Sequence, residues 1–255
     1  MAIALAAGGS PDTIVRLGAA MLAIQFGIGA TNDLADADRD TLAKPAKPIP
    51  AGAVARPAAR TVAAASLLLG LILSASVGPG VLVLAALGAG AGLAYDLRLK
   101  GTPISWLPYT LGVPLLPLFA WLGASGTLPG SILIAAGLAV PAGAGLALAN
   151  ELTDLERDRA AGLASATGLL GRQRAWALGA SLQAVVSVSA AISFGSLGGR
   201  PGAWPILAVS IALLGIGVGL GAGVAVWQRQ RAWELQAISL GLLAAAWLAG
   251  VAPTT

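Results

Sequence analysis

Eight of the eleven acidic residues fall in two short clusters with matching spacing. The clusters are Asn32, Asp33, Asp36, Asp38 and Asp40, and Asn150, Glu151, Asp154, Glu156 and Asp158. Counted from the asparagine, both place carboxylates at positions +1, +4, +6 and +8. Because residues three and four apart share a face of a helix, each cluster predicts a carboxylate triad. The triads are Asp33, Asp36 and Asp40, and Glu151, Asp154 and Asp158.

If the fold brings the two carboxylate triads close together, they would repel each other unless cations neutralise them. The chain has no histidine and no cysteine, so the available ligands are hard oxygen donors, which favour Mg²⁺ over Zn²⁺. A single cluster would be explained equally well as a solvated helix end, but two clusters with the same spacing favour a metal site. The sequence therefore predicts that the six triad residues bind Mg²⁺, which is commonly held by carboxylates together with substrate phosphates.

A third polar segment, Tyr95 to Lys100, lies between the clusters. Arg98 could bind a phosphate through a bidentate fork and Lys100 as a point charge. The alternative is that both side chains only anchor the end of a helix at the membrane surface.

Composition indicates the elements that position these residues. The chain is 57% apolar and 10% charged, whereas soluble domains carry about 25% charged residues. Its apolar stretches are long enough to cross about 30 Å of hydrocarbon. We expect an all-α, polytopic transmembrane bundle with spans near residues 13–31, 59–77, 80–96, 104–122, 130–150, 174–195, 203–227 and 234–252. Prolines 108, 114 and 117 should kink or break the fourth span.

The basic residues predict the topology. Thirteen of the fifteen lie in loops that follow the first, third, fifth and seventh spans, and by the positive-inside rule this side is cytoplasmic. The same scatter argues against a nucleic-acid surface. Both acidic clusters end spans on this side, four helices apart. We therefore expect one domain, residues 1–255, made of two parallel four-helix halves at about 11–125 and 128–252.

These motifs resemble those of the UbiA-type intramembrane prenyltransferase superfamily. The resemblance rests on the two Asn-led acidic motifs and on Tyr95 to Lys100, which is similar to the family's Tyr-x-x-x-Lys loop with one extra residue. The stretch from Lys44 to Gly52 and the pairs Ala161-Gly162 and Leu170-Gly171 fit as well. Glu151 stands where the family often has Asp, and the longer carboxylate can still reach a metal.

The resemblance implies nine helices around a central cavity that opens to lipid, with a cap over its cytoplasmic mouth. It implies that Mg²⁺ on both motifs holds a polyprenyl diphosphate, whose allylic cation is captured by a lipophilic or aromatic acceptor. The implied catalytic residues are Asp33, Asp36, Asp40, Asp154 and Asp158. The implied diphosphate-binding residues are Asn32, Lys47, Tyr95, Arg98, Lys100 and Asn150. Trp106, Tyr109, Phe119 and Trp121 could face the cation or simply pack.

In the family the first acidic motif ends the second helix, whereas here it ends the first, so we expect the family's first helix to be missing. We expect an integral membrane protein, in the plasma membrane, with its site on the cytoplasmic side and no known protein partner. A terpene cyclase begins with the same ionisation and stays open as an alternative. A transporter is disfavoured, because its ionisable residues would lie near the midplane. The acceptor, the prenyl length and a general base for the acceptor cannot be read from the sequence.

Overall fold

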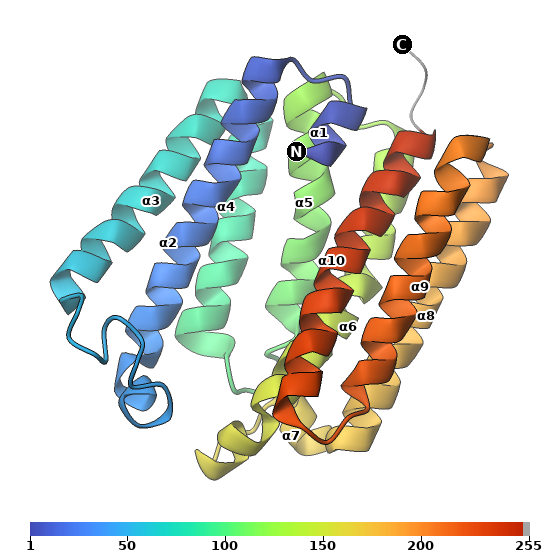
Figure 1. The fold of residues 1–255 in the computed structure, drawn as a ribbon. Helices are drawn as coiled ribbons and strands as arrows, with labels where there is room; N and C mark the ends of the chain where they lie inside the picture. The colour runs from blue at the N-terminus through green and yellow to red at the C-terminus, as the bar shows by residue number, and fades with distance from the viewer. Residues whose placement is uncertain (252–255) are drawn as a thin grey trace.

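The computed structural model describes residues 1–251, apart from the side chains of residues 42 and 43, and this part of the chain is helical throughout (Figure 1). Its elements are α1 (Ala2–Ala6), α2 (Pro11–Ala43), α3 (Arg56–Val77), α4 (Pro79–Ala94), the π-helical turn η1 (Tyr95–Leu99), α5 (Leu107–Ser125), α6 (Gly130–Ala160), α7 (Ala166–Leu170), α8 (Arg172–Ser196), the 3₁₀ turn η2 (Pro201–Ala203), α9 (Trp204–Gly221) and α10 (Val226–Val251).

Within residues 1–251, eight helices are long and apolar enough to cross a membrane, and each overlaps one of the eight expected spans. Large apolar side chains such as Phe26, Ile72 and Ile192 are exposed on their outer surfaces, as expected where lipid is the solvent. The predicted transmembrane bundle is therefore confirmed, and the protein is an integral membrane protein. Residue 252, the predicted end of the last span and of the second half, lies outside the described residues, and the division into two halves stays a prediction.

The helices that carry the acidic motifs are much longer than predicted. α2 has 33 residues and α6 has 31, which at 1.5 Å per residue gives about 50 Å and 47 Å. A hydrocarbon core is only about 30 Å thick, so one end of each helix extends beyond it. The acidic motifs lie at the carboxyl ends of α2 and α6, and the loops after α2, α4, α6 and α9 lie at this same end of the bundle. α1 and the end of α10 lie at the opposite end (Figure 1).

The fourth span is not broken at its prolines, because α5 runs without interruption from Leu107 to Ser125; a kink there stays a prediction. Pro108 stands in the first turn, where a missing N–H costs nothing. Pro114 and Pro117 lie inside the helix, and neighbouring membrane helices can accommodate such residues.

Two apolar clusters hold the bundle together, and α5 contributes to both. One joins α5, α6, α8, α9 and α10 around Phe194 and Trp247, and the other joins α1, α2, α4 and α5 around Leu17 and Phe119. α2 and α3 pack closely through small residues: a Cβ added at Gly70 would lie 2.9 Å from the carbonyl oxygen of Ala20. Such approaches are typical of membrane helices, which associate through van der Waals contact.

Candidate active site

One cavity of about 820 Å³ lies between α2, α4, η1, α5 and α6. Its polar end contains residues of both acidic motifs, which are Asn32, Asp36, Asp40, Asn150, Asp154 and Asp158. Its other end is apolar and includes Ile24, Ile28, Val113, Leu116 and Phe119. The tertiary fold thus places two motifs that are more than a hundred residues apart at the same end of one cavity.

Lys47 binds the first motif from the loop that follows α2. Its ammonium Nζ lies 2.7 Å from Asp33 Oδ1 and 2.6 Å from Asp40 Oδ2. Burial lowers the pKa of Lys47, but the hydrogen bonds and negative charges of Asp33 and Asp40 outweigh it, so the pKa is raised above its ordinary value. Lys47 is therefore a fixed positive charge at the cavity mouth, as expected for a residue that would bind a diphosphate.

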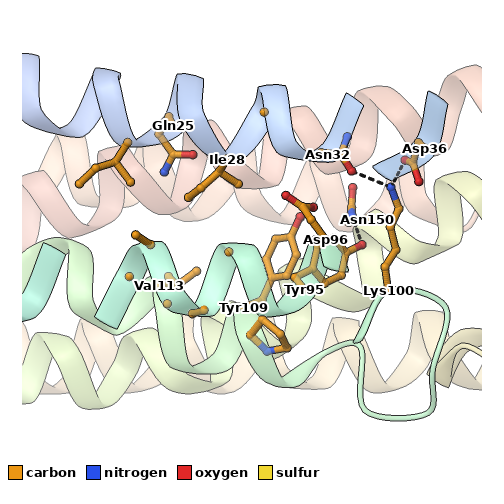
Figure 2. A pocket seen from close by; sticks show the side chains of 18 of the residues that line it. Gln25, Ile28, Asn32, Asp36, Tyr95, Asp96, Lys100, Tyr109, Val113 and Asn150 are labelled. Carbon is orange, nitrogen blue, oxygen red and sulfur yellow. Dashed lines mark hydrogen bonds and ion pairs between the residues drawn. The ribbon is translucent and has the colours of Figure 1, made fainter. Parts of the chain in front are cut away.

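Lys100 binds the same motif from the opposite wall. Its Nζ donates to Asn32 Oδ1 at 2.8 Å and forms an ion pair with Asp36, as Figure 2 shows. Arg39 donates to the other oxygen of Asp36. Each carboxylate of this motif that lines the cavity is thus neutralised by a basic side chain of the protein itself.

The π-helical turn η1 explains how Tyr95 and Lys100 reach the same cavity. The backbone N–H of Lys100 donates to the carbonyl of Tyr95 at 2.8 Å, a bond between residues five apart. This wider turn accommodates the extra residue between Tyr95 and Lys100. Tyr95 Oη in turn accepts a hydrogen bond from Asn150 at 3.5 Å, which links η1 to the second motif (Figure 2).

Glu151 departs from the predicted triad. Its carboxylate is 5% exposed and accepts hydrogen bonds from Ser105 Oγ and from the backbone N–H of Thr167, the latter at 3.1 Å. It lies outside the cavity lining formed by the described residues. The expectation that Glu151 shares one open carboxylate face with Asp154 and Asp158 is therefore wrong, because the segments before α5 and at α7 pack over that side of α6.

Two more predicted site residues, Asp33 and Arg98, are not among the described residues that line the cavity. Asp33 is paired with Lys47 and is partly exposed. Arg98 is exposed and does not line the cavity among the described residues, so the structure does not bring it to the cavity together with Lys100. The reason is the turn itself, in which residues two apart point in different directions.

The predicted aromatic residues divide into two pairs. Tyr109 and Phe119 line the cavity, and Tyr109 packs edge to face against Tyr95 with ring centroids 5.6 Å apart. Trp121 instead belongs to the apolar cluster around Phe194, and Trp106 is exposed. Trp233 of α10, which the sequence did not single out, also lines the cavity.

Asp96 is the principal site residue that sequence reasoning missed. It lines the cavity, the residue is only 8% exposed, and its Oδ2 has no hydrogen-bond partner within residues 1–251. The available signal was its position: of the three acidic residues outside the two clusters, it alone lies at the end of a span beside Tyr95.

The donor set fits Mg²⁺. Asp36 and Asp40 of α2 and Asp154 and Asp158 of α6 present oxygen ligands to one space. No group of three or more acidic residues in the described part of the chain is arranged to hold a metal by itself. Mg²⁺ commonly takes only one or two carboxylates and completes its shell with water and substrate phosphates, so this arrangement is suited to a metal that arrives with an anionic substrate.

Comparison with known proteins decides the family. The model of the UbiA prenyltransferase family matches residues 1–239. The chain belongs to the UbiA prenyltransferase family. This confirms the resemblance drawn from the paired motifs. A digeranylgeranylglyceryl phosphate synthase of Methanothrix thermoacetophila is 30% identical over 183 residues, which are 70% of this chain and 66% of that relative, just under two thirds of its length.

Solved UbiA structures share the fold. A UbiA homologue from Aeropyrum pernix K1 in its apo form has a TM-score of 0.75 at 22% identity, covering 96% of this chain and 92% of that one. A UbiA homologue from Archaeoglobus fulgidus, solved with GPP and Mg²⁺, has a TM-score of 0.73 at 20% identity, covering 96% and 93%. This UbiA-family protein therefore has the same fold as these UbiA homologues.

Proposed function

We propose that this protein catalyses the Mg²⁺-dependent transfer of a prenyl group from a polyprenyl diphosphate to a hydrophobic or aromatic acceptor within the membrane. The observation that carries the proposal is the single cavity with both acidic motifs at one end and an apolar region at the other. A prenyl diphosphate has the same division into a charged head and an apolar chain. The neighbour solved with GPP and Mg²⁺ supports this choice of substrate and metal.

Asp36, Asp40, Asp154 and Asp158 would hold Mg²⁺, with Asp33 next to them outside the lining. When bound, Mg²⁺ would supply positive charge that stabilises the leaving diphosphate. Lys47 and Lys100 would exchange their carboxylate partners for phosphate oxygens, and Asn32, Asn150 and Tyr95 would position the head group.

The transfer breaks the bond between C1 of the prenyl chain and the diphosphate oxygen, and both electrons leave with the diphosphate. A nucleophilic atom of the acceptor then bonds to C1 and loses a proton. The apolar walls would keep water from capturing the allylic cation, and the rings of Tyr109 and Phe119 would offer it their faces.

The chemical identity of the acceptor is a separate part of the proposal. The Methanothrix relative is named for making digeranylgeranylglyceryl phosphate, so a glyceryl phosphate ether is one candidate for this chain. We further infer that the site opens on the cytoplasmic side of the plasma membrane, because the loops next to the polar end carry most of the basic residues.

The test is diphosphate release from farnesyl or geranylgeranyl diphosphate by purified protein with Mg²⁺, with and without a lipid extract as acceptor source. Asp36→Ala should abolish release. Asp38→Asn should not change it, because Asp38 is exposed and pairs with Arg56 away from the cavity. Release that requires the extract supports a transferase, whereas a cyclic product formed without the extract would identify a terpene cyclase. No release from either substrate would refute the proposed reaction.

A further inference from the structure

We propose that Asp96 binds the acceptor: its carboxylate accepts a hydrogen bond from the acceptor's hydroxyl group and takes its proton during transfer, so the acceptor is an alcohol or a phenol. This inference rests on the proposed function and specifies the acceptor class. Three observations carry it, namely the burial of Asp96, its missing partner and its place along the cavity.

The first two observations concern the cost of keeping Asp96 where it is. Asp96 as a whole residue is 8% exposed, and its Oδ2 has no hydrogen-bond partner within residues 1–251. A buried polar oxygen without a partner costs free energy, and more so when it is charged. By contrast, the equally buried Glu151 accepts two hydrogen bonds from the protein. An unsatisfied carboxylate in a cavity wall is typical of a group whose partner is a substrate.

The third observation is location. In Figure 2, Asp96 lies between Lys100 at the polar end of the cavity and Ile28 at its apolar end. C1 of a prenyl diphosphate joins the charged head to the apolar chain, so it must lie at this same junction. The nucleophilic atom of the acceptor must approach C1, which brings it to the wall that carries Asp96.

The atom balance of the reaction requires a proton acceptor there. As the C1–oxygen bond to diphosphate breaks, the acceptor's oxygen, or the ring carbon next to its phenol group, forms the new bond to C1. When the oxygen attacks, the hydroxyl proton is left over and passes to the Asp96 carboxylate and then to water. When the ring carbon attacks, the hydroxyl proton passes to Asp96 as the bond forms, the ring carbon then loses its hydrogen as a proton, and Asp96 returns a proton to the oxygen, so that one proton in total is released to water. Asp36, Asp40, Asp154 and Asp158 are assigned to Mg²⁺, whereas Asp96 belongs to neither acidic motif.

This geometry also excludes one class of acceptor. An acceptor that attacks through a carboxylate would bring a second negative charge against Asp96 in a water-poor site, where like charges repel strongly. The expected product is therefore a prenyl ether or a ring-prenylated phenol and not a prenyl ester.

The experiment compares Asp96→Asn, Asp96→Glu and Asp38→Asn with the wild type, all as full-length protein in detergent. The amide of Asp96→Asn keeps the size and one hydrogen-bond acceptor but is not a base, so kcat for transfer with the lipid extract should fall by roughly 10²-fold or more. Affinity for the non-hydrolysable farnesyl thiolodiphosphate with Mg²⁺ should not change. Asp96→Glu, which retains a carboxylate, should recover part of the rate, and Asp38→Asn should behave as wild type.

A stability readout separates this role from a structural one. Replacing a buried carboxylate whose Oδ2 lacks a hydrogen-bond partner by a neutral amide removes the cost of burying a charge, so the thermal midpoint of Asp96→Asn should stay the same or rise while activity falls. A lower midpoint together with lost binding would mean that the carboxylate only supports the fold.

Two other results would overturn the inference while leaving the proposed function intact. The first is a result against the proposed role of Asp96: either Asp96→Asn transfers the prenyl group at a rate similar to wild type, or the wild-type product is a prenyl ester. The second is a parallel loss of thiolodiphosphate affinity and transfer, which would place Asp96 in the diphosphate site. If wild-type protein releases no diphosphate at all, the proposed function fails first, and this inference fails with it.

Discussion

Replacing Glu151 should destabilise the protein without weakening its hold on a prenyl diphosphate. The carboxylate is 5% exposed and accepts hydrogen bonds from Ser105 Oγ and the backbone N–H of Thr167. It therefore ties α6 to the segment before α5 and to α7. Glu151→Ala removes the acceptor of both bonds and leaves the buried N–H of Thr167 without a partner, whereas Ser105 Oγ keeps the carbonyl of Thr102 at 2.7 Å.

The magnitude follows from these two contacts. A hydrogen bond to a charged group contributes about 1.5–3 kcal/mol, so Glu151→Ala should lower the free energy of unfolding by about 3–6 kcal/mol. For a chain of this size, about 2–4 °C of thermal midpoint corresponds to 1 kcal/mol, which predicts a drop of about 6 °C or more. Glu151→Gln keeps one carbonyl acceptor for the two donors, so it should lose roughly half as much.

The assay is a thermal unfolding scan in detergent, paired with a titration of Mg²⁺ and farnesyl thiolodiphosphate. The control is Glu234→Ala, because Glu234 forms an ion pair with Arg231 and accepts an exposed hydrogen bond from Gln230, and such surface contacts contribute little. We expect midpoints in the order Glu234→Ala, Glu151→Gln, Glu151→Ala, from highest to lowest. A Glu151→Gln protein with a wild-type midpoint but weaker substrate binding would refute this reasoning and return Glu151 to the metal site.

Two other predictions test the metal and the packing. Chelation by EDTA should stop diphosphate release, and added Mg²⁺ should restore it, because the carboxylates at the polar end cannot hold a diphosphate without cations; release that persists in EDTA would contradict a metal role. Gly70→Ala should destabilise the protein by about 1–3 kcal/mol, since its Cβ would lie 2.5 Å from Ile24 Cγ1 and 2.9 Å from the carbonyl oxygen of Ala20. Gly137→Ala, which has open space around the added Cβ, should show no loss in the same thermal scan, and equal losses for both would rule out the close contact as the cause.

The sequence by itself was sufficient for the membrane class, the eight spans and the pairing of the two motifs. Long apolar stretches determine helices in lipid, because backbone polar groups there can be satisfied only within the helix. Repeated spacing determined which carboxylates share a helical face, as Asp36 and Asp40 do. The even number of helices between the motifs correctly placed them at the same end of the bundle.

Tertiary structure decided which of these side chains reach the cavity. Helical spacing gives the face on which Glu151 lies, but the packing of Ser105 and Thr167 against that face turns the carboxylate into a structural group. A π-helical turn cannot be read from residue types, and it is this turn that brings Asp96 and Lys100 to the cavity and leaves Arg98 outside. The sequence therefore determined the chemistry that is available, whereas long-range packing, which depends on neighbours distant in the chain, decided where each group acts.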